Sequence, residues 1–379
     1  MKKETICVHG EQNSENSFGA ISVPIYQTAS FSHPSLGEST GYDYSRLQNP
    51  TREELENIMT SLENGIDSMA FSTGMAAISA LMELFEPGDH IIASDDLYGG
   101  TPRLFDNISK KNKIEIDYID TSDLIGVKNL IKENTKALFI ETPTNPMMQI
   151  TDLKAISKIG KEQNLIVIVD NTFLSPYFQN PLSLGADIVV HSGTKYIGGH
   201  NDTLGGFLTT NSQELSDRLR FIFKTIGSCL GPMDSWLMIR GIKTLAIRMK
   251  KQEENAMKIA KWLKKSDKVK KVFYIGLPDH PQYEISKSQS RGFGAMISFE
   301  VDSYETVVNV LENIKIIKFA ESLGGVESLM TFPKIQTHAD VDEKILEAKG
   351  VNDRLLRLSV GIEDIDDLIK DLESALGGI

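Results

Sequence analysis

The sequence predicts an α/β fold with a mostly parallel central sheet, and three observations support this. Short apolar runs alternate with amphipathic stretches from about residue 51 to 210, which is typical of strand–helix–strand units. Because most of these runs are apolar along most of their length, we expect helices on both faces of the sheet. The chain has 379 residues, more than one core usually organises, so a second, smaller domain is expected.

The expected elements follow in chain order. Residues 1–50 are rich in Gly, Ser, Pro and aromatic residues without periodicity, so we expect an N-terminal arm that contacts a neighbouring subunit. Residues 51–240 carry the alternating pattern and form the expected large domain. Its helices are predicted at 51–64, 74–85, 123–134 and 151–163, and its strands at 68–71, 90–94, 114–120, 136–142, 165–170 and 186–192.

The pattern changes past residue 210. A long helical stretch is expected at about 212–266, followed by strand-like segments at 269–275 and 295–301 and a helix at 364–376. These features predict an α+β domain at 241–379, with the boundary somewhere between 235 and 250.

Composition restricts the kind of partner and the compartment. A net charge of -12 argues against nucleic acid, because binding to a phosphate backbone needs clustered positive charge. Cys7 and Cys229 lack metal or redox spacing, and His191 and His200 have no third ligand, so no metal is expected. Because no stretch resembles a signal peptide or membrane span, we expect a cytoplasmic protein without a membrane partner.

Polar residues follow several of the apolar runs. In an open parallel sheet these positions meet at the carboxyl edge, where ligands bind. Asn145 and Asp170 each follow such a run, and the 189–200 stretch VVHSGTKYIGGH places Lys195 shortly after another. Gly74 and Met75 open a predicted helix, whose backbone N–H groups suit a phosphate, although Gly74 could equally ease a tight turn.

Asp170 and Lys195 allow two interpretations. They lie 25 residues apart with one apolar strand between them, which is consistent with neighbouring strand ends. They could form a structural ion pair that compensates a buried carboxylate. Alternatively, Lys195 could form a Schiff base while Asp170 holds a pyridinium nitrogen, which is the arrangement of a pyridoxal phosphate site.

Nine motifs extend this second interpretation to nearly the whole chain. They are VPIYQTASF (23–31), YDYSRLQNPTR (42–52), FSTGMAAI (71–78), DDLYGGT (95–101), ETPTNP (141–146), VDNTF (169–173), HSGTKYIGGH (191–200), AESLGGVESL (320–329) and RLSVGIED (357–364). From about residue 6 to 376 the chain resembles the Cys/Met-metabolism family of pyridoxal phosphate enzymes. The resemblance implies the aminotransferase-like fold known as fold type I, with pyridoxal 5'-phosphate as cofactor and an amino acid as substrate.

The resemblance also implies roles at the cofactor. Lys195 corresponds to the Schiff-base lysine and proton carrier, Asp170 to the partner of the pyridine nitrogen, and Tyr98 to the tyrosine that stacks on the ring and assists proton transfer. The phosphate would be held by Gly74, Met75, Ser192 and Thr194. Tyr44 and Arg46 match residues that reach the phosphate from a neighbouring subunit, which implies a homo-oligomer, usually a tetramer built as a dimer of dimers.

Further positions bear on the substrate. Arg357 resembles the clamp for the α-carboxylate, assisted by Asn145 and the Ser322 region. Glu321 and Gly100 match cystathionine γ-lyases and γ-synthases, where methionine γ-lyases usually have an apolar residue and a cysteine. The residues that would meet the distal end of cystathionine are Asp43 and Arg103, and those that depart from the family pattern near the entrance are Gln48 and Asp340.

A cystathionine γ-lyase is therefore the favoured hypothesis. Cystathionine γ-synthase is the first alternative and a methionine or homocysteine γ-lyase the second, because all of them use the same cofactor residues. A catalytically inactive binding relative and a cofactor-free Schiff-base enzyme also stay open, although intact Lys195, Asp170, Tyr98 and Arg357 argue against the first of these.

Overall fold

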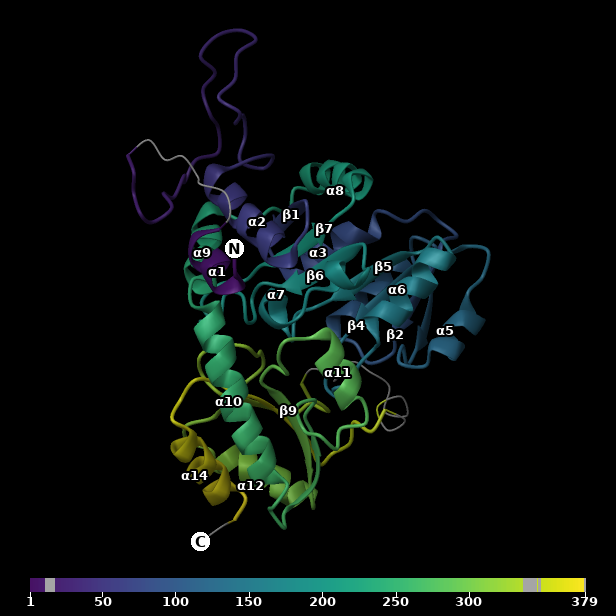
Figure 1. Ribbon diagram of the computed structural model, residues 1–379, viewed down its shortest axis with the longest axis vertical. Coiled ribbons are helices and arrows are strands. Elements are labelled where there is room, and N and C mark those ends of the chain that lie inside the picture. The colour runs from purple at the N-terminus through teal and green to yellow at the C-terminus, as the bar shows by residue number, and fades with distance from the viewer. Residues whose placement is uncertain (11–17, 337–345, 347–348, 378–379) are drawn as a thin grey trace.

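Two sheets organise the protein in the computed structural model, which describes residues 1–10, 18–336, 346 and 349–377 (Figure 1). The larger sheet has the strand order β1-β7-β6-β5-β4-β2-β3. Its strands are β1 (Asp67–Phe71), β2 (His90–Ser94), β3 (Glu115–Ile119), β4 (Thr135–Glu141), β5 (Ile166–Asp170), β6 (Ile188–Ser192) and β7 (Gly206–Thr210). Neighbours from β3 to β6 run parallel, and only β7 is antiparallel to its neighbours β6 and β1, so the expected mostly parallel sheet is confirmed.

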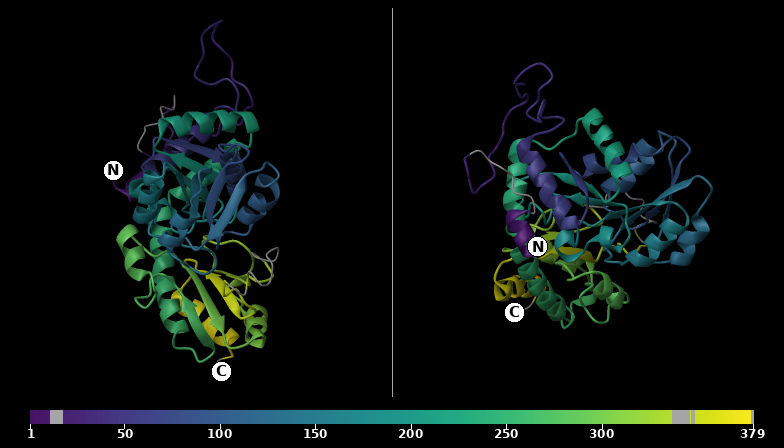
Figure 2. Two further views of the ribbon diagram at one scale, coloured as in Figure 1. Left: turned by 90° about the vertical axis from the view of Figure 1, so that its right-hand side faces the viewer. Right: turned by 45° about the horizontal axis from the view of Figure 1, so that its top comes forward.

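Helices cover both faces of this sheet, as the apolar strands predict (Figures 1 and 2). Ile168 and Val190 pack in one cluster with apolar residues of α3 (Gly74–Met82) and α8 (Gln213–Ile226). Because side chains alternate along a strand, Val169 faces the other way, into a cluster with α6 (Leu153–Glu162). The other helical segments of this part are α2 (Pro50–Glu63), α4 (Gly100–Leu104), η1 (Phe105–Ser109), α5 (Leu124–Leu130), α7 (Ser175–Phe178) and η2 (Pro181–Leu184).

The smaller sheet has the order β10-β11-β12-β9-β8 and lies in the C-terminal part of the chain. Its strands are β8 (Val269–Phe273), β9 (Met296–Val301), β10 (Lys318–Phe319), β11 (Leu329–Thr331) and β12 (Leu355–Ser359). The helices α11 (Tyr283–Gln289), α12 (Tyr304–Asn313) and α14 (Ile365–Ala375) belong to the same part. A second domain of mixed strands and helices was expected here, and its start at residue 241 stays a prediction.

The expected long helix at 212–266 is instead three helices: α8, α9 (Pro232–Ile242) and α10 (Leu245–Leu263). Gly227 ends α8 with a φ of 77°, a left-handed conformation that favours glycine. Pro232 then starts α9 at a position where its missing N–H costs nothing.

The N-terminal arm also differs in part from its expected form. Residues Lys3–His9 form a short helix, α1, which buries Ile6 and Cys7 against the body of its own chain. From residue 18 onward the segment is exposed and projects away from the two sheets (Figure 1). Among the described residues, no helix combines the length and apolar character needed to cross a bilayer.

Candidate active site

A cavity of about 300 Å³ opens at the carboxyl edge of the large sheet, where ligands bind in parallel α/β folds. The predicted site residues that line it are Gly74, Met75, Tyr98, Asn145, Asp170, Ser192, Thr194 and Lys195. A neighbouring hollow shares Thr194 with this cavity and is lined by Glu321 and Ser322. The structure thus brings together most of the residues that the sequence placed at strand ends.

Lys195 lies in the loop after β6, and its amine donates to the Ser322 hydroxyl at 3.0 Å. Burial and the positive charge of Arg357 lower the pKa of Lys195 to about 8, against a weaker opposing effect of Glu321. An amine with such a pKa is partly neutral near pH 7 to 8 and can act as a nucleophile.

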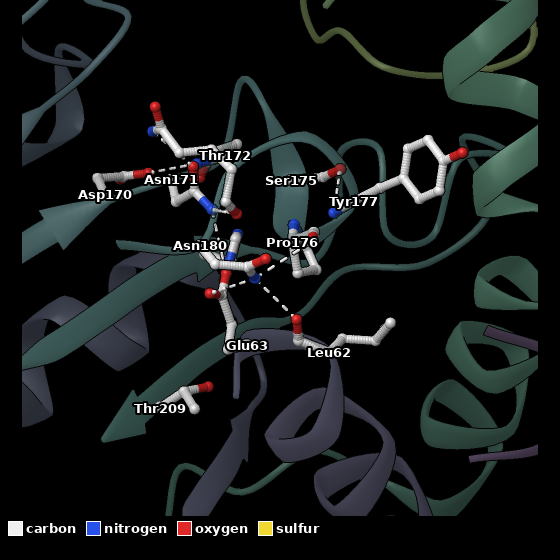
Figure 3. Close-up of polar contacts among 12 residues, drawn as sticks. Leu62, Glu63, Asp170, Asn171, Thr172, Ser175, Pro176, Tyr177, Asn180 and Thr209 are labelled. Carbon is white, nitrogen blue, oxygen red and sulfur yellow. Dashed lines mark hydrogen bonds and ion pairs between the residues drawn. The ribbon is translucent and has the colours of Figure 1, made fainter. Parts of the chain in front are cut away.

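Asp170 ends β5 and is buried on the side of the sheet that faces the cavity. Its Oδ1 accepts the backbone N–H of Thr172 at 2.9 Å (Figure 3). Burial raises the pKa of Asp170, and bonds from Thr172 only partly offset this. Among the ion pairs and hydrogen bonds of the described residues, none joins Asp170 to Lys195, so the structural ion pair is absent. A buried carboxylate in this position suits a cation inside the cavity.

The opposite end of the cavity has the features of a phosphate site. Gly74 begins α3, whose N-terminal N–H groups carry partial positive charge. A Cβ on Gly74 would lie 3.1 Å from the Cβ of Ser192, so glycine leaves the space between them open. Thr172 supports this end, because its hydroxyl accepts the backbone N–H of Ser192 at 2.9 Å.

Tyr98 follows β2 and lines the cavity with its ring 43% exposed. Its backbone N–H donates to Glu141 Oε2 at 2.9 Å. Glu141 ends β4, is buried, and lines the same cavity. Burial, reinforced by Asp170, raises the pKa of Glu141 well above its usual range and so favours the neutral form of this carboxyl group.

Glu141 was not predicted as a site residue, although it is the first residue of the ETPTNP motif. Thr172 was missed in the same way within VDNTF. Their positions could have identified them, because Glu141 ends β4 and Thr172 lies two residues after the end of β5, where other site residues were predicted.

Arg357 lies on β12, is 1% exposed, and brings a guanidinium close to the cavity from the smaller sheet. Its Nη1 donates to Asn145 Oδ1 at 2.7 Å, and its Nη2 donates to the carbonyl of Ser322 at 3.3 Å and to the hydroxyl of Thr331 at 3.2 Å. Its buried Nε has no partner among the described residues. Burial lowers the pKa of Arg357 to about 10, so the group stays charged and can bind a carboxylate.

Other predicted residues lie outside this cavity within a single chain. Tyr44 and Asp43 are on the exposed arm, where Asp43 pairs with His33 at 3.2 Å. Arg46 donates to the Lys224 carbonyl at 2.6 Å. Arg103 and Gln48 are exposed, on α4 and the arm respectively, and Asp340 lies outside the described residues.

Pyridoxal 5'-phosphate matches the chemistry of this cavity. Lys195 can condense with its aldehyde, Asp170 can hold its pyridine nitrogen, and the start of α3 can receive its phosphate. The fold and the site together define a pyridoxal-phosphate-dependent enzyme.

The chain belongs to the family of Cys/Met metabolism PLP-dependent enzymes, whose model matches residues 4–377. It is 49% identical to the cystathionine gamma-lyase of Bacillus subtilis (strain 168), over 100% of both chains. It is also 49% identical to the cystathionine beta-lyase of Lactococcus lactis subsp. cremoris (strain MG1363), over 98% of both. The crystal structure of cystathionine gamma-lyase from Lactobacillus plantarum complexed with L-serine superposes with a TM-score of 0.97 at 44% identity, over 100% of this chain and 99% of that one. The protein is therefore a PLP-dependent carbon–sulfur lyase or synthase.

Proposed function

We propose that this protein is a cystathionine γ-lyase, which converts cystathionine to cysteine, 2-oxobutanoate and ammonia. The environment of Lys195 is the observation that carries the proposal. Elimination at the γ-carbon requires a base that removes the α-proton and an acid that delivers protons further along the substrate. An amine with a pKa of about 8 can do both near neutral pH.

The other cavity residues support the same chemistry. The bound cofactor supplies an aldehyde that links to amines and a ring that withdraws electrons from the α-carbon. Asp170 would keep the pyridine nitrogen protonated, and Tyr98 would lie against the ring. Arg357, with an unpartnered Nε and a neighbour in Asn145, would hold the substrate α-carboxylate.

Two positions favour a cystathionine substrate over methionine. Glu321 lines the hollow beside Lys195, where a carboxylate can meet the distal ammonium group of cystathionine. Gly100 leaves room for Tyr98, because a Cβ there would lie 2.6 Å from the tyrosine Cε1. The cysteine typical of methionine γ-lyases would therefore displace the ring.

Cystathionine γ-synthase is the main alternative, since the same residues serve γ-replacement, and a methionine or homocysteine γ-lyase comes next. A β-lyase also needs a test, because the relatives named gamma-lyase and beta-lyase are equally similar to this chain at 49%. The inactive-relative alternative is weakened by the presence of Lys195, Asp170, Tyr98 and Arg357 around one site.

An assay with four substrates distinguishes these activities. The purified protein is incubated with cystathionine, homocysteine, methionine, or O-acyl-homoserine plus cysteine, and kcat/KM is compared for each. The proposal predicts the highest value for cystathionine, with 2-oxobutanoate and cysteine as products. Pyruvate and homocysteine from cystathionine would mark a β-lyase, and dominant thioether formation would mark a γ-synthase.

We also propose a cytoplasmic tetramer whose active sites are shared between subunits. The exposed arm supports the sharing of the site. Tyr44 and Arg46 lie on a segment that projects from the body of the chain (Figure 1). Phe18, Ile21 and Leu36 on this segment are almost fully exposed, at 97%, 99% and 105%, which disfavours an isolated chain in water. In our proposal the arm covers a neighbouring subunit, where Tyr44 and Arg46 reach the phosphate and Asp43 reaches the substrate entrance.

A further inference from the structure

A buried polar network lies beneath the cofactor site and centres on Glu63, the last residue of α2 (Figure 3). The Glu63 side chain is fully buried. Its Oε1 lies 2.6 Å from His191 Nε2 and accepts Asn171 Nδ2 at 3.0 Å, while its Oε2 accepts Asn180 Nδ2 at 3.2 Å. One carboxylate therefore joins α2 to three other segments of the large sheet and its loops.

Two of these donors immediately adjoin predicted cofactor residues. Asn171 follows Asp170, and His191 precedes Ser192. The strands that carry them are parallel neighbours, with Asp170 opposite Val190. Because successive side chains point to opposite faces of a sheet, the cavity-lining pair of Asp170 and Ser192 and the two donors lie on opposite sides.

We propose that Glu63 is a positioning residue for the cofactor: from the far face of the sheet it fixes the separation of Asp170 and Ser192, which hold opposite ends of the pyridoxal phosphate. This inference rests on the roles proposed for those two residues. Glu63 never touches the cofactor in this arrangement. It acts through Asn171 and His191, each of which is bonded covalently to a residue that does.

The chemistry of the network explains why a carboxylate is needed here. A carboxylate only accepts hydrogen bonds and has room for several donors, whereas a glutamine amide would turn an NH2 group toward at least one of them. Gln179 further holds Asn171 in place. Its Nε2 donates to Asn171 Oδ1 at 3.0 Å, and its backbone carbonyl accepts Asn171 Nδ2 at 2.9 Å. Because Asn171 and His191 both bond Oε1, a glutamine carbonyl in its place could still accept both, whereas a side chain without an acceptor, such as leucine, would release both strand ends.

The test compares Glu63→Leu with Asp371→Leu, a matched control in the smaller sheet region. Asp371 is also buried and accepts three hydrogen bonds, from the backbone N–H groups of Lys315, Ile316 and Ile317. For each apoprotein, the Kd for added pyridoxal 5'-phosphate is measured from its visible absorbance, together with the Tm without cofactor. Both substitutions are expected to lower Tm, because each leaves buried donors poorly paired.

A positioning role predicts that only Glu63→Leu raises the Kd, by about tenfold or more, since a displaced contact at one end of the ligand loses about 1.4 kcal/mol or more. A Kd within twofold of the wild type would overturn the proposal and leave Glu63 a structural residue. If Glu63→Leu fails to fold, Asn171→Ala and His191→Phe each remove one donor and must raise the Kd, or the proposal fails.

Failure of the proposed function has a different signature. If the wild-type protein binds no pyridoxal phosphate, the roles of Asp170 and Ser192 are wrong. If the wild type binds it and Glu63→Leu binds it equally well, only the positioning proposal is wrong.

Discussion

The Arg357 guanidinium donates to the Asn145 carboxamide across 2.7 Å, and this bond joins the two sheets of the protein. Arg357 lies on β12 of the smaller sheet, while Asn145 follows β4 of the larger one. Both side chains are 1% exposed. The proposed carboxylate clamp therefore depends on how the two parts of the chain pack together.

Replacing Arg357 with lysine should lower kcat/KM by about 100-fold, because an ammonium group cannot reproduce the two parallel hydrogen bonds of a guanidinium. The loss should fall mainly on KM, and the Kd for cofactor should change little. Arg354→Lys is the control: Arg354 lies just before β12 and pairs with Glu300 at 2.6 Å with 42% of its side chain exposed. Equal losses in both variants would argue against a clamp at Arg357.

Lys195→Met should abolish turnover and yet stabilise the protein in the absence of cofactor. The pKa of Lys195 is lowered to about 8 from 10.5, so the unfolded state binds more protons between these values and folding is disfavoured below them. Removing the charge at pH 7 should raise the free energy of unfolding by about 1–3 kcal/mol. The gain should shrink as the pH rises through 8 toward 10.5, which urea unfolding at several pH values will measure. A destabilised variant at pH 7 would contradict this.

Glu141→Gln should be tolerated, because a neutral carboxyl group and an amide both accept the Tyr98 N–H. We expect the Kd for pyridoxal phosphate and the kcat to stay within about threefold of the wild type. Glu141→Leu removes the acceptor and leaves the Tyr98 backbone N–H unpaired, which should lower the free energy of unfolding by about 1–3 kcal/mol. We expect this variant to bind pyridoxal phosphate more weakly and to have a lower kcat. A severe defect in the glutamine variant would show that Glu141 works as an anion.

Sharing of the active site predicts that two inactive variants restore activity when mixed. Arg46→Ala removes the proposed phosphate contact of the arm, and Lys195→Ala removes the proposed Schiff-base lysine of the cavity. In a mixed dimer, one site combines an intact cavity with an intact arm, so random exchange should return about a quarter of wild-type activity. Co-refolded mixtures are assayed against each variant alone. If the mixture is no more active than the two variants assayed separately and added, Arg46 belongs to the site of its own chain or to no site.

Local patterns predicted most of the large sheet. Five predicted strands of 51–210 became the parallel strands β2 to β6. Four of them are largely buried, which leaves a continuous apolar signal, whereas β3 lies at the edge of the sheet and is only partly buried. The strand β7 was not predicted, since Gly206–Thr210 has only two consecutive apolar residues, Phe207 and Leu208, between a glycine and two threonines. Its place between β1 and β6 depends on antiparallel pairing with both, which no local pattern encodes.

At the candidate site, too, local patterns predicted some residues and missed others. The cavity residues from Gly74 to Lys195 were identified from strand ends and motifs, and their proximity follows from a parallel sheet. Glu141 and Glu63 were not, because a glutamate within a helix or strand looks like any solvated charge until its burial is known. The roles of Tyr44, Arg46, Asp43 and Arg103 stay predictions.

The sequence alone determined the alternation of strands and helices and the family, and it identified Lys195 and Asp170 as candidates, since local patterns and short motifs carry this information. The family resemblance grouped Asn145 and the Ser322 region with Arg357. Only the tertiary structure decided that Lys195 donates to Ser322, 127 residues away, and that Arg357 donates to Asn145, 212 residues away. Hydrophobic periodicity specifies which face of an element is buried, but not which distant segment covers it. The lowered pKa of Lys195 comes from that burial and from Arg357, so it belongs to the packed fold and to no single motif.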